Sequence, residues 1–433
     1  MRRNALPETM RILFISNNFP PEVNAPATRL YEHAKQWVAD GHEVEVLTSA
    51  PHFPEGRVYR GYANRFATEV VDGIRVTRVP IYVTANEGVV KRTLSYISFM
   101  LSARWHVRRL QQRPDLVVAT SPQFFAGVAG YLVGKKLRVP FVFEVRDLWP
   151  ESIVAVGAMR RNAVIRFFER IEQFLYERAA HIVVVTDAFK TFITNRGIPG
   201  EKITVLKNGA DLDAWGQPLD PERLAAWRKR LGVEGKFVAA YIGTIGMAHR
   251  ADVMLEAAQR CSDPDVVFMV VGTGAERARL EARQAELNLP NVRLVDKVPK
   301  EDVRYLMALT DVSVVHLRRS DLFKTVIPSK IFEAMATRTP IVLGVEGETK
   351  AIIEAAGAGI PITPEDAGEL VEAVLRLRND PVLHAQMGER GYAFVHEHFN
   401  REKLARRYAD LLARIAGRDS VRARPAPAEV EAV

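Results

Sequence analysis

Cysteine is almost absent from this sequence: Cys261 is the single one among 433 residues. One cysteine cannot close an intrachain disulfide, so a disulfide-rich scaffold is excluded and a reducing compartment such as the cytoplasm is favoured. An apolar signal-peptide core is also missing near the N-terminus. The longest uncharged run, 116–134, is interrupted by the tetrapeptide TSPQ. This interruption favours a strand, a turn and a helix over a membrane span.

Two ligand-binding signatures are incomplete or missing. The sequence GTG at 272–274 follows a predicted strand, but Arg277 stands where a dinucleotide fingerprint needs its third glycine. This departure argues against a nicotinamide-dependent enzyme. No cluster of Asp or His with the spacing of metal ligands follows a predicted strand of the second half. We therefore expect no metal ion and no cofactor.

Acidic residues are scarce in the first half of the chain. The net charge is +8, and residues 1–200 carry 27 Lys and Arg against 18 Asp and Glu, whereas the remainder carries 33 against 34. The excess positive charge therefore lies in the first half. Such asymmetry predicts a polyanionic or membrane-surface partner for this half, with ordinary solvated charge as the alternative. No nucleic-acid-binding module accompanies the charge, so no nucleic-acid partner is expected.

Short β-branched runs alternate with helical stretches along the chain. This alternation predicts two doubly wound parallel sheets and an α/β fold class. Ligands of such sheets bind beyond the carboxyl ends of the strands, so function is sought in the segments that follow them. Strands are predicted at 11–18, 41–50, 74–80, 115–122, 140–147 and 180–187, and then at 237–246, 266–274, 292–299, 311–317 and 340–344.

The predicted organisation has two Rossmann-like domains between two terminal extensions. A Pro/Ala-rich, charged composition predicts disorder in the tail. The predicted segments are a disordered extension at 1–9, an N-terminal domain at 10–205, a C-terminal domain at 206–398, a last helix at 399–417 and a disordered tail at 418–433.

One stretch of the second half, TVIPSKIFEAMATRTPIVLG at 325–344, combines a turn, a helix and a buried strand. With Ser329 as the N-cap, the capping-box position is occupied by Phe332, so Glu333 is not needed for capping. A helix N-terminus beside Lys330 suits a diphosphate. The carboxylate of Glu333 can accept from both hydroxyls of a ribose. Together these residues predict a nucleoside diphosphate site, with a solvated Lys and Glu on an exposed face as the alternative.

Two glycine-containing loops follow strands of the same half. YIGTIG at 241–246 contributes Gly243 and Gly246, and the GTG sequence contributes Gly272 and Gly274. Glycine lets a backbone approach a ligand closely, although simple turn chemistry is the alternative for each glycine alone. We expect both loops to contact the same ligand as Lys330.

Several motifs occur in order across nearly the whole chain: NNFPPE, GHEVEVLTSAPHFPEG, VRDLWPES, VLKNGAD, VVGTGAE and PSKIFEAMA. With these motifs the chain resembles glycosyltransferase family four, and within it the WbuB-like transferases of O-antigen and exopolysaccharide assembly. The resemblance implies a GT-B fold, with two Rossmann-like domains, an active site between them and a last helix that crosses back to the first domain. It also implies a UDP-sugar-type donor on the C-terminal domain, an acceptor on the N-terminal domain, no metal and retention of anomeric configuration.

The sequence departs from the family pattern on the donor side. The family has two Glu separated by seven residues, and here the first position is Thr325 and the second is Glu333. The family often has Arg and Lys on the loop after the first strand of the second domain, and here Thr244 and His249 stand in their places. The residues expected to bind the donor are Gly243, Thr244, Gly246, His249, Gly272, Gly274, Thr325, Pro328, Ser329 and Glu333, with Arg250, Lys324 and Lys330 as the candidate cations.

The segment FEVRDLWPES at 143–152 ends a predicted strand with several ionisable side chains. Asp147 is expected to orient the acceptor or take its proton, and Arg146, where the family commonly has His, to steady the diphosphate as the sugar leaves. Glu151 is the third catalytic candidate, and an Arg–Asp pair that fixes a loop is the alternative. A leaving diphosphate can itself deprotonate the acceptor, so a pair of carboxylates is not required. Expected on the acceptor side are Glu22, Asn24, Arg29 and His52.

Two predicted helices are relevant to the question of membrane binding. At 162–178 an apolar stripe predicts a helix that faces the core, and its members are Val164, Phe167, Phe168, Ile171, Phe174 and Leu175. At 91–110 apolar residues surround the helix and basic residues interleave, which favours an interfacial segment on anionic lipid over partial burial or self-association. The expected lipid contacts are Lys91, Arg92, Arg104, Arg108 and Arg109, with Tyr96, Phe99 and Met100 inserting.

The sequence thus predicts a retaining, metal-independent glycosyltransferase of the cytoplasm, peripherally associated with the membrane. Its expected donor is a UDP-sugar, for which an N-acetylated amino or deoxyamino sugar is one candidate, and its expected acceptor is a polyprenyl-diphosphate-linked saccharide. Two alternatives stay open: a UDP-sugar-hydrolysing epimerase of the same architecture, and a non-catalytic GT-B scaffold.

Overall fold

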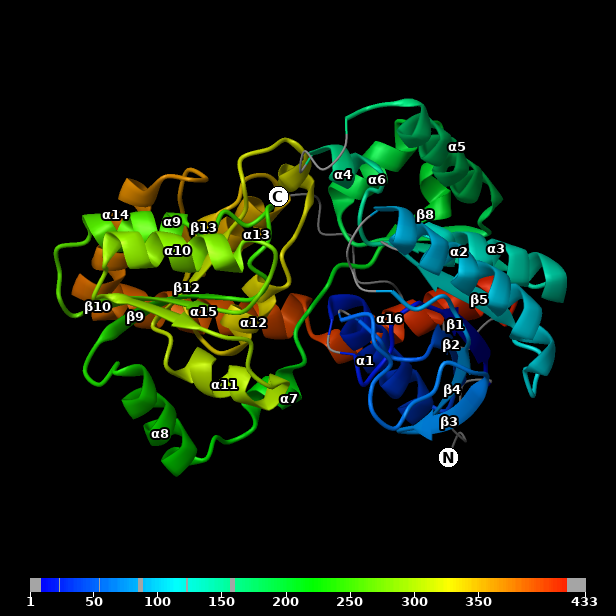
Figure 1. Cartoon of the computed structure of the whole chain (residues 1–433), viewed down its shortest axis with the longest axis horizontal. Coiled ribbons are helices and arrows are strands. Elements are labelled where there is room, and N and C mark those ends of the chain that lie inside the picture. The colour runs from blue at the N-terminus through cyan, green and yellow to red at the C-terminus, as the bar shows by residue number, and fades with distance from the viewer. Residues whose placement is uncertain are drawn as a thin grey trace, which may run out of the picture. The chain divides into compact units, whose positions relative to one another are not determined.

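A computed structural model describes residues 9–22, 24–53, 55–84, 89–121, 124–155 and 160–418. These residues form two compact units, one comprising residues up to 207 together with those from 402 onward, and the other comprising 208–401 (Figure 1). Each unit is built on a largely or wholly parallel sheet, which confirms the α/β fold class. The predicted disorder of 1–8 and 419–433 concerns segments outside the described residues.

The sheet of the N-terminal unit has eight strands in the order β3-β4-β2-β1-β5-β6-β7-β8. Only β3 runs antiparallel to its neighbour, and it is an edge strand with exposed side chains that the sequence analysis missed. The central strands are apolar and buried, as expected for parallel strands covered on both faces. The strands are β1 (Arg11–Ile15), β2 (Glu43–Ser49), β3 (Ala67–Val71), β4 (Ile74–Val79), β5 (Leu116–Thr120), β6 (Phe141–Val145), β7 (His181–Val184) and β8 (Ile203–Val205).

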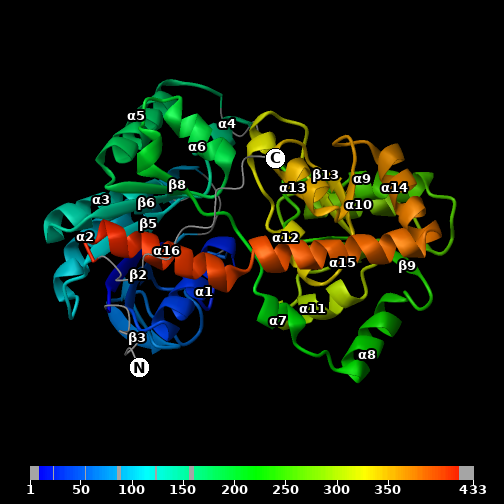
Figure 2. The same ribbon diagram turned by 180° about the vertical axis from the view of Figure 1, so that it is seen from behind.

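Helices cover both faces of this sheet. Helix α16 lies with α1 on one face, as Figure 2 shows, and the indole Nε1 of Trp37 donates to the carbonyl oxygen of Ala405 at 2.9 Å. Helices α2, α3 and α5 belong to the opposite layer, with α3 in contact with both of the others. The helices are α1 (Ala25–Ala39), α2 (Val89–His106), α3 (Phe124–Leu137), α4 (Glu151–Ala155), α5 (Ala163–Arg178), α6 (Asp187–Thr194) and α16 (Arg401–Ile415), with short 3-10 turns η1 (Val107–Arg109) and η2 (Gly200–Lys202).

The C-terminal unit contains a six-stranded parallel sheet in the order β11-β10-β9-β12-β13-β14. One core joins this sheet to α9, α10 and α14, and a second core joins its other face to α8 and α11 (Figure 1). The strands are β9 (Phe237–Ile242), β10 (Val266–Val271), β11 (Val292–Val295), β12 (Val312–His316), β13 (Ile341–Gly344) and β14 (Gly359–Pro361). The helices are α7 (Leu212–Gly216), α8 (Pro221–Leu231), α9 (Val253–Arg260), α10 (Arg277–Leu287), α11 (Lys300–Ala308), η3 (Leu322–Thr325), α12 (Lys330–Ala336), α13 (Glu348–Ala356), α14 (Ala367–Asn379) and α15 (Pro381–His398).

Each sheet has one place where the strand order reverses direction. In the N-terminal unit β1 pairs with both β2 and β5, and in the C-terminal unit β9 pairs with both β10 and β12. The connections on either side of such a switch point diverge, which leaves a crevice for ligands beyond the carboxyl ends of the two strands. The topology therefore directs attention to the loops after β1 and β5 and to the loops after β9 and β12.

Within the described ranges, no helix combines the length and the apolar content that crossing a bilayer requires.

Candidate active site

Lys330 lies directly beneath the loop that follows β9. Gly243 has a φ of 142°, and a Cβ placed on it would come within 2.5 Å of Lys330 Cε and 2.7 Å of Nζ. The Lys330 ammonium stands 3.7 Å from the centre of the Tyr241 ring. Burial lowers the pKa of Lys330 to about 7, and the nearby charge of Glu333 opposes this shift only in part. Glycine at 243 thus makes room for a cation whose charge a bound anion would stabilise.

The other glycines hold two loops together. The N–H of Gly243 donates to Val271 O at 2.8 Å, and the N–H of Ile245 donates to Thr273 O at 2.9 Å. A Cβ on Gly272, whose φ is 137°, would overlap the carbonyl oxygen of Gly243. Backbone-to-backbone packing therefore explains the glycine at 272, and a Cβ on Gly274 would likewise overlap the carbonyl of Ile245. Contact of these glycines with a donor stays a prediction.

Thr244 and His249 stand after β9 where the family often has Arg and Lys, and neither side chain carries a positive charge at neutral pH. Burial, together with the charge of Lys330, lowers the pKa of His249 to about 4. His316 Nε2 accepts from the N–H of Glu365 at 2.8 Å, so His316 Nδ1 carries the hydrogen and donates to His249 O at 3.0 Å. Thr244 accepts the Tyr241 hydroxyl at its carbonyl oxygen, at 2.6 Å. A cation that neutralises a diphosphate must therefore come from a position other than 244 or 249.

Arg250 is committed to carboxylates of its own unit. Its guanidinium pairs with Asp252, with Glu365 at 3.2 Å and with Glu256 at 3.9 Å. Three acidic partners neutralise this cation, which argues against its predicted role on a diphosphate. Lys324, another predicted cation, is exposed and pairs with Asp321 at 2.9 Å and with Glu346 at 3.8 Å.

Two arginines that the sequence analysis did not single out stand at the switch point. Arg318 and Arg319 directly follow β12 and are exposed. The N–H of Arg318 donates to Ala248 O at 2.7 Å, which ties this loop to the loop after β9, and the N–H of Arg319 donates to Glu365 Oε1 at 2.8 Å. Among the described residues, no carboxylate pairs with either guanidinium. Both line a hollow of about 170 Å³, together with Lys324 and Glu346.

Helix α12 presents a polar side next to Lys330. Ile331, Phe332 and Met335 are buried, and Lys330 and Glu333 are partly buried. Ser329 makes no side-chain cap, and the N–H groups of Ile331 and Phe332 already donate to Pro328 O at 3.2 Å and Ser329 O at 3.1 Å. These two N–H groups are therefore not free for a ligand, and Lys330 stays the main candidate of this turn for binding an anion.

Thr325 has a local role. Its hydroxyl donates to Leu322 O at 2.6 Å and so closes the 3-10 turn η3. This bond gives the Thr325 hydroxyl a hydrogen-bond partner within its own turn, so no ligand is needed to explain the residue.

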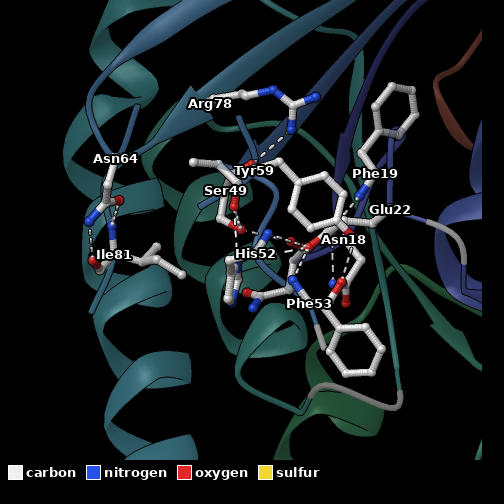
Figure 3. Close-up of polar contacts among 12 residues, drawn as sticks. Asn18, Phe19, Glu22, Ser49, His52, Phe53, Tyr59, Asn64, Arg78 and Ile81 are labelled. Atoms are coloured by element: carbon white, nitrogen blue, oxygen red, sulfur yellow. Dashed lines mark hydrogen bonds and ion pairs between the residues drawn. The ribbon is translucent and has the colours of Figure 1, made fainter. Parts of the chain in front are cut away.

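In the N-terminal unit, Glu22 joins two loops instead of facing an acceptor. Its carboxylate accepts from Asn18 Nδ2 at 3.0 Å, from the N–H of Phe19 at 3.3 Å, and from the N–H groups of His52 and Phe53 at 2.9 Å each (Figure 3). The side chain is buried. Four donors fill its acceptor positions, so the loop after β1 and the loop after β2 are held together by one carboxylate. The predicted acceptor contact of Glu22 is not supported.

The remaining acceptor candidates are also engaged in holding structure. Asn24 Oδ1 accepts from the N–H of Ala27 at 3.0 Å and caps α1. Buried Arg29 donates to Leu206 O at 3.3 Å. His52 Nδ1 lies 2.9 Å from Ala50 O, so it carries the hydrogen and leaves Nε2 as an acceptor. Of these residues, His52 keeps an atom suited to a substrate hydroxyl.

The loop after β6 carries the predicted catalytic pair. Ser121 Oγ accepts from the N–H groups of Arg146 at 2.7 Å and Asp147 at 3.3 Å, which fixes this loop to the end of β5. Burial raises the pKa of Asp147, whose carboxylate accepts from Ser152 Oγ at 3.1 Å. Arg146 Nε lies 3.9 Å from the buried carboxylate of Glu144. This loop adjoins the switch point of its sheet.

Glu151, the third catalytic candidate, belongs to a different group of charges. Burial raises its pKa, and the nearest charges acting on it are those of Arg196, Glu169 and Arg161. The same group includes buried Glu172, which accepts from Tyr176 OH at 2.6 Å. Charges other than those of Arg146 and Asp147 thus act on Glu151, and its catalytic role stays a prediction.

Comparisons with known proteins agree with this architecture. Residues 24–209 match the family described as glycosyl transferase 4-like domain, and residues 225–394 match glycosyl transferases group 1. The chain belongs to the GT-B glycosyltransferases of family four. The two matches together span most of both units, and the predicted family and fold are confirmed. The narrower WbuB-like subgroup stays a prediction.

Individual relatives of this glycosyltransferase are distant. The chain is 23% identical over 373 residues to a colanic acid biosynthesis glycosyl transferase, WcaI, of Escherichia coli K12, covering 84% of this chain and 91% of that protein. Among solved structures, Anabaena HepE in complex with UDP and glucose has a TM-score of 0.70 at 19% identity, covering 93% of this chain and 99% of that one. WaaG, a glycosyltransferase involved in lipopolysaccharide biosynthesis, has a TM-score of 0.66 at 17% identity, covering 92% and 99%. At these identities the structures establish the fold alone.

Proposed function

We propose that this glycosyltransferase moves a sugar from a UDP-sugar to a polyprenyl-diphosphate-linked saccharide, with retention of configuration, in the synthesis of a cell-surface polysaccharide. The colanic acid role in the name of WcaI and the lipopolysaccharide role of WaaG support the pathway class. The UDP in the HepE complex supports a UDP-linked donor. We place the reaction at the cytoplasmic face of a membrane, where a lipid-linked acceptor is held.

The observation that carries the proposal is the position of Lys330 under Gly243 with Glu333 one turn along α12. A diphosphate beside this loop would meet the Lys330 ammonium, and a ribose would meet the Glu333 carboxylate. Arg318 and Arg319, on the loop after β12, supply the two further positive charges that the family positions lack. Charge-assisted hydrogen bonds of this kind are stronger than neutral ones.

These residues suit the departure of a nucleoside diphosphate. Negative charge grows on the leaving phosphate as the bond to the sugar breaks, and fixed cations stabilise that charge. An oxygen of the leaving phosphate then takes the proton of the attacking hydroxyl on the same face of the sugar, which retains configuration. On the acceptor side we assign Asp147 to orienting the hydroxyl and Arg146 to balancing charge.

No group of three or more His, Cys, Asp or Glu side chains in the described part of the chain is placed to hold a metal ion. Metal independence remains a prediction. It rests on the proposal that Lys330, Arg318 and Arg319 neutralise the donor diphosphate in place of a metal ion. Transfer assays should therefore include EDTA, and a loss of activity that magnesium restores would contradict this assignment.

The decisive experiment is a thermal-shift screen of purified protein against nucleotide sugars, followed by transfer assays with a lipid-linked saccharide. Glu333→Ala should lower UDP affinity roughly 10–100-fold, because it removes charge-assisted hydrogen bonds, with little change in melting temperature. Glu354→Ala, which removes an exposed acid of α13, is the matched control. Unchanged UDP binding by Glu333→Ala would refute the ribose assignment. Release of free sugar without acceptor would instead favour the hydrolysing epimerase, and no turnover with any donor would favour the scaffold.

A further inference from the structure

Helix α5 exposes part of the apolar stripe that the sequence predicted to face the core. Val164 and Phe174 are exposed, and Phe167 is 56% exposed. The buried residues of α5 are instead Ile165, Glu172, Leu175 and Tyr176. The prediction of a core-facing stripe holds for Leu175, which is buried, and for Phe168, which packs against Phe124 and Trp149. It is wrong for Val164 and Phe167, which α5 exposes to solvent.

Helix α2 also exposes apolar side chains along its length. Val90, Leu94, Leu101 and Trp105 are each more than half exposed, and Trp105 is 66% exposed. Their spacing of four, seven and four residues keeps them on one face, over about 22 Å of helix. Phe99, one of the predicted inserting residues, is fully buried. The apolar side that faces solvent is therefore a different one from that predicted.

The two exposed stripes belong to one helical layer. Lys136 Nζ of α3 donates to Arg104 O of α2 at 2.7 Å, and the ring of Tyr131 on α3 lies 5.1 Å from that of Phe174 on α5. Helix α3 therefore connects α2 to α5 on the same side of the sheet (Figures 1 and 2). Seven of the eleven large apolar side chains that are exposed in the described chain lie on these two helices.

The α2 and α3 part of this layer is strongly basic, whereas α5 is balanced, with three Arg against three Glu. Residues 88–143, which include α2 and α3, carry nine Lys and Arg against one acid, Asp115. That acid already pairs with Arg418 at 2.9 Å. Arg166 and Arg170 of α5 are exposed beside its stripe, and the guanidinium of Arg178 lies 5.5 Å from the centre of the Phe174 ring. Aromatic and aliphatic side chains thus alternate with cations over the layer.

We propose that α2 and α5 together form a face that binds an anionic lipid bilayer, with Trp105, Leu101 and Phe167 inserted at the headgroup level. An interfacial helix combines an apolar side with flanking cations, and its binding grows with the buried apolar area and with lipid charge. The excess of cations on α2 and α3, with Arg166 and Arg170 exposed on α5, complements an acidic surface. The predicted cations of α2 and η1 belong to one half of this face, and α5 supplies the other half.

This face deepens the proposed function, because a lipid-linked acceptor is presented at a membrane. The binding itself needs no sugar transfer, so the two proposals fail separately. Vesicles of equal parts phosphatidylcholine and phosphatidylglycerol, without any saccharide lipid, should cosediment with the protein at low salt and release it as salt rises. Vesicles of phosphatidylcholine alone should bind it far more weakly.

Paired variants test each helix. Leu101→Ser with Trp105→Ser on α2, and Val164→Ser with Phe167→Ser on α5, should each lower the partition coefficient at least about tenfold. Both should leave UDP affinity and melting temperature near those of the parent, because these side chains are exposed. Val382→Ser changes an exposed valine of α15 and is the matched control, expected to bind vesicles normally. Fluorescence adds a direct readout, because insertion of Trp105 should shift the emission to the blue and Trp105→Phe should abolish that shift.

Three outcomes would overturn the proposal. Unchanged cosedimentation of the α5 pair would remove α5 from the face. A concentration-dependent dimer that the same variants disrupt, with no vesicle binding by the parent, would assign the face to self-association. Binding only to vesicles that contain a lipid-linked saccharide would assign the attraction to the acceptor and not to the bilayer.

Discussion

The two switch points use opposite means to fix their loops. In the C-terminal unit the loops after β9 and β10 are joined by backbone hydrogen bonds, which the missing side chain of Gly272 permits. In the N-terminal unit the loops after β1 and β2 are joined by one buried carboxylate, that of Glu22. The first solution needs no charged side chain, whereas the second uses one. A charged residue after a strand is therefore not by itself evidence of a ligand site.

The strongest test of this contrast is Gly272→Ala. The new Cβ would overlap Gly243 O at a φ that side chains rarely adopt, so we expect the free energy of unfolding of the C-terminal unit to fall by at least about 3 kcal/mol. Chemical denaturation measures this change. Gly200→Ala, where a Cβ meets open space, should alter stability by no more than about 0.5 kcal/mol. Equal effects of the two variants would show that the loops are not held by backbone approach.

Glu22→Gln tests the carboxylate of the other unit. The amide keeps the shape, but its NH₂ group would face backbone N–H donors. The free energy of unfolding should fall by about 2–3 kcal/mol because bonds to a charged acceptor are lost. UDP affinity should not change. Glu55→Gln alters an exposed acid on the loop after β2, which Glu22 contacts, and should have little effect on stability. Full stability of Glu22→Gln, with impaired acceptor binding, would restore the predicted acceptor role.

A smaller effect is expected from Arg318→Gln combined with Arg319→Gln. If these guanidinium groups neutralise the donor diphosphate, UDP affinity should fall about tenfold, while affinity for uridine stays constant. Isothermal titration calorimetry compares the two ligands. Arg283→Gln removes an exposed cation of α10 and serves as the control. A parallel loss for UDP and uridine would indicate a disturbed loop and not a phosphate contact.

The pH dependence of UDP binding probes Lys330. Its pKa of about 7 in the free protein lies far below the usual value for lysine, so the ammonium form is already losing protons at neutral pH. A bound diphosphate favours the charged form, and binding should take up a proton above pH 7. UDP affinity should thus fall about fivefold between pH 7 and pH 8. Titrations in buffers of different ionisation enthalpy measure the proton uptake. In Lys330→Gln, binding should be weaker and the slope over this interval flat; a slope like the parent's would place the titrating group elsewhere.

Sequence periodicity predicted the strands but not the side of every helix. The parallel sheets followed from short apolar runs, but β3, β8 and β14 were missed. An exposed antiparallel edge strand such as β3 lacks such a run, and β8 and β14 are only three residues long. On α5 the apolar stripe was visible, but the buried side contains Glu172, which Tyr176 and Arg196 satisfy. Arg196 is 24 positions away, so no local pattern could reveal that a carboxylate faces the core.

The part of the candidate site that lies within one short segment could be predicted from the sequence. Lys330 and Glu333 share a helix, and their relation follows from helical spacing. Arg318 and Arg319 were missed because two arginines after a strand look like ordinary surface charge until the strand order shows a switch point beside them. Asn24 and Glu22 were given ligand roles because their hydrogen-bond partners only become apparent in three dimensions.

The packing of α16 has a consequence for the order in which the protein is made. The core of the N-terminal unit includes Tyr408, Leu411 and Leu412, which pack with Trp37. Those residues leave the ribosome only after the whole C-terminal unit, about 200 residues and roughly 10–40 s of translation later. Until then the nascent N-terminal unit presents the apolar surface around Trp37 without its cover. Its native core is therefore completed only as synthesis ends, after the C-terminal unit has already been made.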